Sequence, residues 1–272
     1  MNYYRGKATH LNLDRFLSLL MCAAILICGF DVSTVAQQNR NRSPASPPTR
    51  LSATDIARRV LPAVSFIVCD DGESSSQGSG FFIGPGLVIT NLHVVKGMRR
   101  GSLRTVGGRK LTFHISHVLQ IDETSDLALL GIYDAFNVPI PSLQLDARSN
   151  LSVGETIYAF GNPEGLTGTM SPGIVSAGLR NTRDRILLQI SAPISSGSSG
   201  GPVVDSRGRV VGVALGSLKE GQNLNFAVHA STVRLFLNRW YKDNDPKISI
   251  WVGLVNAPGQ KRIDNEWVWL PE

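Results

Sequence analysis

The chain has 272 residues, with 27 lysines and arginines against 21 aspartates and glutamates, so its formal net charge is +6. That length predicts one or two domains and a sizeable core. The basic residues are scattered along the chain, which argues against a nucleic-acid-binding stripe. No spacing of His, Cys or acidic residues is typical of a metal site, so we expect neither a metal nor a cofactor.

Residues 1–36 have the organisation of a secretory signal peptide. Basic residues precede an apolar run over 16–30, and small residues at 34–36 offer a cleavage point before Gln37. The run is short for a membrane span, which needs about 20 residues. We therefore expect an exported protein, periplasmic or secreted, whose mature form does not contact a membrane. The alternative is a membrane-tethered protein held by an uncleaved signal anchor.

Residues 37–53 are rich in Asn, Arg, Ser and Pro and are predicted to form a disordered linker. A folded domain is expected over 54–242. It begins with a short helix, for which Ser52 or Thr54 is the predicted cap and Pro62 the predicted end.

Beyond this helix, short apolar runs rich in β-branched residues recur about every ten positions, with turn residues between them. The predicted strands are 63–69, 80–83, 87–90, 102–106, 111–115, 127–132, 156–160, 173–179, 186–190, 203–204, 210–215 and 225–228. One further helix is predicted over 232–242. This pattern favours an antiparallel all-β protein built of barrels or sandwiches.

Cys69 lies in the first of these strands. The other two cysteines fall within the predicted signal sequence, which leaves Cys69 without an intrachain disulfide partner. We interpret it as a buried structural thiol.

Residues 197–202 read Gly-Ser-Ser-Gly-Gly-Pro and lie between two apolar runs. Glycines on both sides of Ser199 allow backbone dihedrals that are closed to other residues, so its hydroxyl can stand clear of the chain. The amides of Gly197 and Ser199 could then form an oxyanion hole, worth roughly 3 kcal/mol per donor. A Gly/Ser-rich surface turn is the alternative interpretation.

A serine nucleophile needs a base and an acid that orients the base. His93 directly follows the strand over 87–90, and Asp126 lies at the start of the strand over 127–132. A carboxylate bonded to the histidine Nδ1–H would leave Nε2 free to accept the serine proton. The alternative for Asp126 is a residue that caps the strand. We interpret the other four histidines as structural.

Residues from about 54 to 240 resemble the protease domain of the HtrA/DegP branch of trypsin-like serine proteases. The matching blocks are 78–83, 90–95, 125–130, 159–163, 171–176, 191–194, 197–202, 210–213 and 224–228. The resemblance implies two six-stranded antiparallel β-barrels with a C-terminal helix. It also implies His93 as general base, Asp126 as its orienting acid, Ser199 as nucleophile, and the amides of Gly197 and Ser199 as oxyanion donors.

The function that this resemblance implies is that of a serine endopeptidase acting on unfolded or damaged proteins, with a homotrimer as a candidate assembly. Proteases of this fold that cut after Lys or Arg carry an acid six residues before the nucleophile, where this chain has Pro193. We therefore predict small or medium aliphatic P1 residues. The predicted S1 residues are Pro193, Val213, Ala214, Leu215 and Asn225.

Two other functions are compatible with these residues. One is a latent or non-proteolytic chaperone or binding module on the same barrels. The other is an esterase, against which the absence of a G-x-S-x-G motif argues.

Residues 243–272 are predicted to form a hairpin from strands at 248–255 and 266–270, joined through 257–260. HtrA-type chains usually carry PDZ domains after the protease, and 30 residues past Lys242 are too few for one. We expect this segment either to pack on the second barrel or to dock a partner.

Overall fold

The computed structural model describes residues 50–182, 185–217, 224–243, 260–263 and 266–269. The chain divides into two units, 1–49 and 50–272, and the elements described below belong to the second. The predicted signal sequence and residues 37–49 of the predicted linker lie outside the described residues. Within the described ranges, no helix is long and apolar enough to cross a membrane.

The first helix of this unit, α3 (Ala53–Val60), forms where the sequence predicts it and has Ser52 as its cap. The Ser52 hydroxyl accepts a hydrogen bond from Asp55 N at 3.1 Å, which satisfies one of the amides that a helix start leaves free. A short 3-10 turn, η1 (Leu61–Ala63), contains Pro62 and ends the helix.

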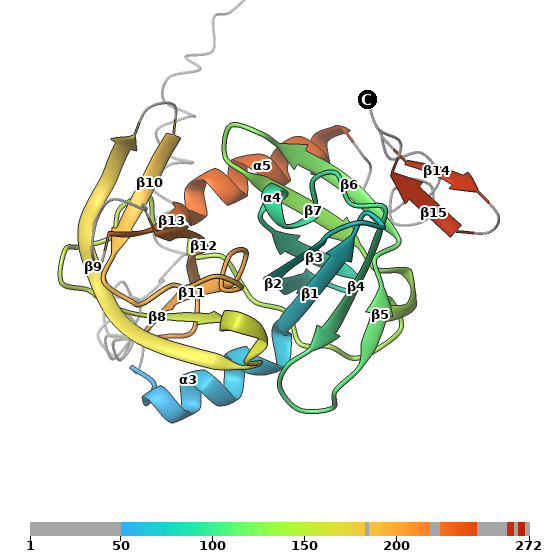
Figure 1. The fold of residues 1–272 in the computed structure, drawn as a ribbon. Helices are drawn as coiled ribbons and strands as arrows, with labels where there is room; N and C mark the ends of the chain where they lie inside the picture. Colours follow the sequence, from blue (N-terminus) through green and yellow to red (C-terminus); the bar gives the residue numbers. More distant parts are fainter. Residues whose placement is uncertain (1–49, 183–184, 218–223, 244–259, 264–265, 270–272) are drawn as a thin grey trace, which may run out of the picture. The chain divides into compact units, whose positions relative to one another are not determined.

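Seven antiparallel strands form the N-terminal sheet, in the order β5-β4-β1-β2-β3-β7-β6 (Figure 1). They are β1 (Val64–Asp70), β2 (Ser75–Gly84), β3 (Leu87–Thr90), β4 (Arg100–Thr105), β5 (Thr112–His114), β6 (His117–Asp122) and β7 (Leu127–Gly131). The one-turn helix α4 (Leu92–Val95) follows β3. The hairpin of β2 and β3 turns through Gly86, whose φ of +63° favours a residue without Cβ.

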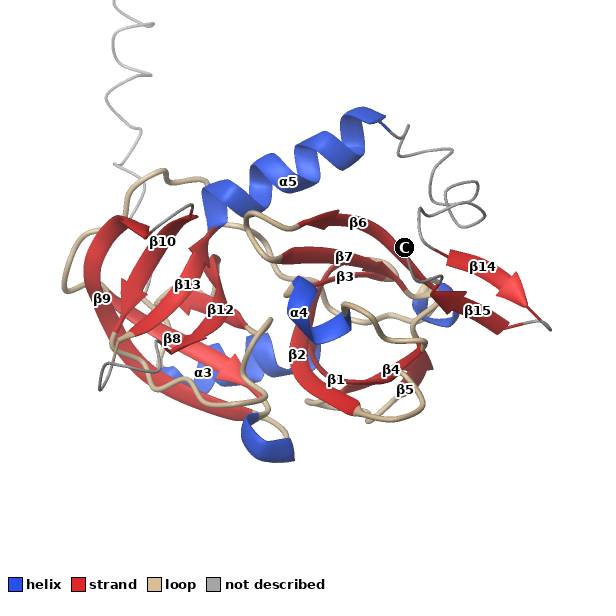
Figure 2. Ribbon diagram, turned by 45° about the horizontal axis from the view of Figure 1, so that its top comes forward, coloured by secondary structure: helices blue, strands red, loops and turns tan. Residues whose placement is uncertain are grey.

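The N-terminal sheet differs in detail from the predicted six-stranded barrel. Its edge strands, β5 and β6, are consecutive in the chain, and Figure 2 shows the sheet curling. Between them, Ile115 N–H donates to Gly101 O at 2.9 Å and Ser116 N–H donates to Gly131 O at 3.0 Å. The extra strand is β6, which we did not predict because its residues do not alternate clearly between apolar and polar.

The C-terminal sheet is a closed six-stranded barrel, as predicted, in the order β10-β13-β12-β11-β8-β9. Its strands are β8 (Thr156–Gly161), β9 (Thr169–Thr182), β10 (Arg185–Ile190), β11 (Pro202–Asp205), β12 (Val210–Ser217) and β13 (Asn225–His229). Helix α5 (Ala230–Asp243) follows β13 directly. The all-β architecture with a C-terminal helix is therefore confirmed.

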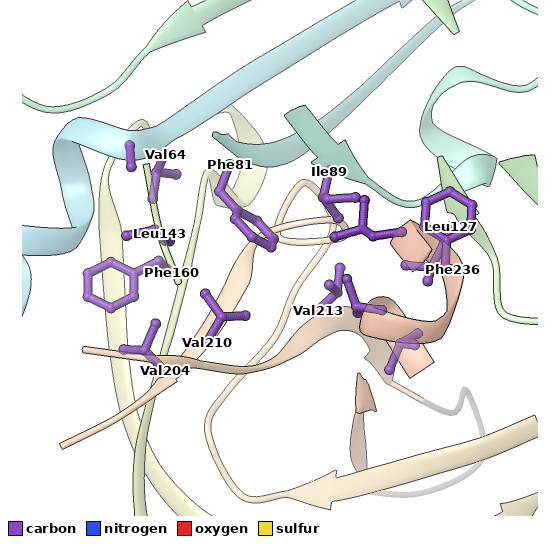
Figure 3. Packing of buried hydrophobic residues seen from close by; sticks show 14 of the residues in the cluster. Val64, Phe81, Ile89, Leu127, Leu143, Phe160, Val204, Val210, Val213 and Phe236 are labelled. Carbon is purple, nitrogen blue, oxygen red and sulfur yellow. The ribbon is translucent and has the colours of Figure 1, made fainter. Parts of the chain in front are cut away.

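One hydrophobic cluster joins the two sheets (Figure 3). Phe81 and Ile89 enter it from the N-terminal sheet, Phe160 and Val213 enter it from the barrel, and Phe236 enters it from α5. All five side chains are at most 1% exposed. Burial of each aliphatic or phenyl side chain contributes roughly 1.5–3 kcal/mol, so this cluster holds the two sheets together.

Cys69 lies in a second cluster, inside the N-terminal sheet, and only 3% of it is exposed. Burial, with a smaller contribution from the charge of Asp70, raises the pKa of its thiol to about 12. The prediction of a buried free thiol is therefore confirmed.

The predicted C-terminal hairpin needs a correction. Strand β15 (Glu266–Trp269) forms within the predicted 266–270, but its partner is β14 (Gln260–Ile263). Gln260, which we placed in the connection, is thus in a strand. The predicted partner at 248–255 lies outside the described residues.

Candidate active site

Asp126 and His93 form the best-defined contact of the site. The imidazole Nδ1 lies 2.6 Å from Asp126 Oδ2, and the backbone N–H of His93 donates to Asp126 Oδ1 at 2.9 Å. Both carboxylate oxygens therefore bind the same residue. Because a carboxylate only accepts hydrogen bonds, the contact places the proton of the neutral imidazole on Nδ1 and leaves its Nε2 as an acceptor.

The local backbone explains why these two residues meet. His93 lies in α4, the turn that follows β3, and Asp126 directly precedes β7, the strand paired with β3. Asp126 has a φ of +54°, and its carbonyl accepts hydrogen bonds from Leu92 N at 3.1 Å and from Asn91 Nδ2 at 2.9 Å. The carboxylate is 11% exposed and the imidazole 49% exposed, so the acid is shielded while the base faces outward.

Ser199 lies on the loop between β10 and β11 of the barrel, and strand β12 holds this loop. Gly200 N donates to Ala214 O, and Ala214 N donates to Gly201 O, each at 2.8 Å. The hydroxyl of Ser199 donates to Leu215 O at 3.2 Å. The hydroxyl proton must therefore turn away from Leu215 O before it can be donated to an imidazole.

The same loop touches the segment that carries the histidine. Gly200 has a φ of +84°, and a Cβ there would collide with the carbonyl oxygen of Ser79 and the hydroxyl of Thr90. Thr90 ends β3, three residues before His93. Glycine at this position therefore allows the loop that carries Ser199 to pack against the end of β3.

The comparisons with known proteins agree with this geometry. The family model for the trypsin-like peptidase domain matches residues 78–213. The chain belongs to the trypsin-like peptidase family. This confirms the resemblance inferred from the sequence blocks.

Named relatives and solved structures extend the likeness. The chain is 32% identical over 227 residues to the mitochondrial serine protease HTRA2 of Bos taurus, which covers 78% of this chain and 47% of the relative. It is 31% identical over 217 residues to the serine protease HTRA1 of Xenopus tropicalis, which covers 74% of this chain and 45% of that one. The chain thus spans about half the length of these relatives.

Two crystal structures resemble the trypsin-like peptidase fold of this chain at 26% sequence identity. The alignment with a serine endoprotease from Yersinia pestis has a TM-score of 0.62 and covers 72% of this chain and 68% of that protein's chain. The active form of a protease from M. tuberculosis gives 0.61 and covers 72% of this chain and 90% of its own.

The predicted S1 residues occupy different environments in this peptidase fold. Val213 and Ala214 are fully buried and face two different core clusters, and Leu215 is partly buried. Asn225 is 4% exposed and its side-chain amide donates to Ala192 O at 2.9 Å. The ring of Pro193 is exposed. The preference for a small or medium aliphatic residue at P1 stays a prediction.

Sequence reasoning gave no role to two buried polar residues near the loop between β10 and β11, which carries the candidate nucleophile Ser199 and is called the nucleophile loop below. Ser79 and Asn162 are fully buried, and the Ser79 hydroxyl donates to Gly197 O at 2.7 Å. Both residues lie in sequence blocks that match the peptidase family. That match was the available signal, but a serine in a strand and an asparagine in a turn have many ordinary explanations. Among the described residues, no group of three or more His, Cys, Asp or Glu could hold a metal ion.

Proposed function

We propose that this protein is a serine endopeptidase that cleaves peptide bonds through Ser199, His93 and Asp126. The observation that carries the proposal is the 2.6 Å contact between His93 Nδ1 and Asp126 Oδ2, with the loop that carries Ser199 packed against Thr90 at the end of β3. In the neutral imidazole that contact places the proton on Nδ1 and leaves Nε2 as the acceptor, which is what a serine hydroxyl needs as a base.

The reaction would follow from these positions in two steps. Ser199 Oγ attacks the scissile carbonyl while His93 Nε2 takes its proton, and the charge on the carbonyl oxygen is stabilised by the amides of Gly197 and Ser199. His93 then gives the proton to the leaving amine, which departs and leaves an acyl-enzyme. A water molecule, deprotonated by the same imidazole, attacks the ester and releases the acid. Asp126 holds the imidazole and stabilises its charged form throughout.

For the substrate, we propose unfolded or damaged polypeptides with a small or medium aliphatic residue at P1. Two observations support the P1 preference. Pro193 stands where an acid would bind a basic side chain, and the Asn225 amide is already occupied by Ala192 O. A panel of peptides that differ only at P1 tests this, and faster cleavage after Arg or Lys than after Val or Ala would contradict it.

The decisive experiment is reaction of the purified protein with a fluorophosphonate probe, followed by mass spectrometry of the labelled peptide. We expect one label, on Ser199. The Ser199→Ala variant should take no label and should leave casein intact while its thermal unfolding stays close to that of the wild type. Casein cleavage at the wild-type rate by this variant would refute the assignment.

A latent chaperone or binding module is the second candidate, and one observation favours it. The Ser199 hydroxyl donates to Leu215 O, so its proton is directed away from the imidazole in this arrangement. If the protein binds unfolded polypeptide but is not labelled by the probe, this function replaces the proteolytic one. Suppression of aggregation by Ser199→Ala, measured by light scattering, would separate binding from cleavage.

For location and assembly, we propose an exported protein, periplasmic or secreted, that forms a homotrimer after cleavage before Gln37. The basic and apolar runs of residues 1–36 support export, and the homotrimer is carried over from the family that the sequence blocks resemble. Mass spectrometry of the mature N-terminus and sedimentation of the purified domain test the two parts. An intact N-terminus in the membrane fraction would support the tethered alternative.

A further inference from the structure

We infer that Ser79 is a positioning residue for the oxyanion loop, and that Asn162 directs its hydroxyl proton. This inference rests on the proposed function, because it assigns a role to residues that support Ser199 and Gly197. The juxtaposition is between β2, which carries Ser79, and the loop that carries the nucleophile.

Ser79 binds two carbonyls of the nucleophile loop. Its hydroxyl donates to Gly197 O at 2.7 Å, and its backbone N–H donates to Ser199 O at 2.8 Å. The two residues it binds are those whose amides we assign to the oxyanion hole. Among the hydrogen bonds of the described residues, no other residue donates to both of these carbonyls.

Two consecutive peptide planes that precede Ser199 are held by hydrogen bonds. The plane after Gly197 is fixed by Ser79 Oγ at its carbonyl and by Ser195 O, which accepts from Ser198 N at 3.0 Å. The plane between Ser198 and Ser199 is fixed at its carbonyl by Gly201 N, also at 3.0 Å. Because a trans peptide directs N–H and C=O to opposite sides, the Ser199 N–H must point away from Gly201.

Within the described part of the chain, the amides of Gly197 and Ser199 themselves have no acceptor in the protein. Two N–H groups left free on a loop whose neighbouring peptides are all bonded are what a developing oxyanion requires. The Ser79 hydroxyl is the side chain that completes this pattern, since it binds the carbonyl of the plane between Gly197 and Ser198.

Asn162 determines where the Ser79 proton goes. A hydroxyl has one proton and two acceptor sites. Asn162 N and Asn162 Nδ2 both donate to Ser79 Oγ at 3.0 Å and occupy both acceptor sites, so the proton is left for Gly197 O. The orientation of the amide is unambiguous, because Nδ2 also faces the carbonyl of Ser65 and Oδ1 faces the N–H of Gly168.

The test uses two substitutions of Ser79 and one matched control. Ser79→Ala removes the hydroxyl, and Ser79→Cys fills the space with a weak donor. Ser65→Ala is the control: Ser65 is an equally buried serine on the neighbouring strand β1, and its hydroxyl has no hydrogen-bond partner in the described residues. Rates are expressed per active site, counted from the endpoint of fluorophosphonate labelling, so that loss of folded protein is removed from the comparison.

We expect Ser79→Ala to lower kcat about 100-fold with KM changed less than about threefold, because misplacing a catalytic group by about 1 Å costs that much. Affinity for a peptide boronate, which forms a tetrahedral adduct, should fall by the same factor as kcat. Ser79→Cys should fall between wild type and alanine, and it carries the test if Ser79→Ala does not fold. Ser65→Ala should match the wild type.

Three results would overturn the inference. They are an unchanged kcat per site in the Ser79 variants, a change confined to KM, or an equal loss in Ser65→Ala, which would indicate a general effect of core polarity. Failure of the proposed function is distinguishable, because it would show first as a wild-type protein that takes no label at Ser199.

Discussion

Substitution of Asp126 by asparagine is the sharpest perturbation of the site. In the structure both carboxylate oxygens accept from His93, one from its backbone N–H and one from its ring. An amide has one oxygen, so Asp126→Asn can serve only one of these donors. The backbone N–H cannot change its role, whereas the imidazole can move its proton. We therefore expect the amide NH₂ to face Nδ1 and to force the proton onto Nε2, where it blocks the base.

The expected cost is a drop in kcat of about 10⁴-fold, as found for the wrong histidine tautomer in related triads. That factor corresponds to about 5 kcal/mol of transition-state stabilisation. The assay is kcat/KM on a labelled peptide, expressed per folded molecule from the thermal unfolding amplitude. Retention of more than a tenth of the wild-type rate by correctly folded Asp126→Asn would refute the reasoning.

Asp122 provides the matched control for this substitution. It lies four residues earlier, accepts from Ser125 N at 3.0 Å and pairs with Arg239, without a contact to His93 in the described structure. Asp122→Asn removes the same charge from the end of β6, where the loop that carries Asp126 begins. We expect its kcat to stay within about twofold of the wild type and its stability to fall by about 1 kcal/mol, in the range of partly exposed ion pairs.

The remaining predictions concern backbone strain, pH and thiol reactivity. Gly200→Ala should lower the free energy of unfolding by about 3–5 kcal/mol, because it adds a steric collision to a φ of +84°. Gly154→Ala should lower it by only about 1–2 kcal/mol, because Gly154 has a φ of +87° but open space around it. Urea unfolding of the two variants compares them directly. Burial, together with the charge of Arg234, lowers the pKa of His229, so at mildly acidic pH the unfolded chain binds a proton that the folded chain does not bind. The free energy of unfolding should therefore fall as the pH drops below about 6.5. His229→Gln should make this pH dependence smaller in unfolding measured from pH 5 to 8. Because burial raises the pKa of Cys69 to about 12, a thiol reagent at pH 8 should label the native protein only at its unfolding rate, and rapid labelling without denaturant would contradict this.

Much of the strand order could be predicted because most strands are apolar runs bounded by turn residues. The limit is visible in β2, whose apolar part was predicted as 80–83 but which begins at Ser75. Its first five residues are polar or glycine, yet they pair with β1 from Ser79↔Phe66 to Ser75↔Asp70. That pairing depends on the partner strand, so local hydrophobic periodicity could not indicate it.

The site shows the same division between local and tertiary information. His93 and Asp126 could be singled out from their positions beside apolar strands, and the structure joins them directly. Ser79 and Asn162 could not, because each acts through a partner more than 80 positions away in the chain. Which carbonyl a buried serine reaches is decided by how two sheets pack, and this has no signature in a short stretch of sequence.

The packing between the sheets therefore has two components with different consequences. The shared apolar cluster supplies most of the adhesion, but burial of apolar area is non-directional and tolerates small displacements. The hydrogen bonds of Ser79 and Asn162 across the same boundary are directional, and a shift of the barrel would leave buried polar groups without partners, at about 1–3 kcal/mol each. Apolar contacts thus hold the barrel against the N-terminal sheet, while a few buried polar contacts fix how the loop that carries Ser199 is aligned against β2.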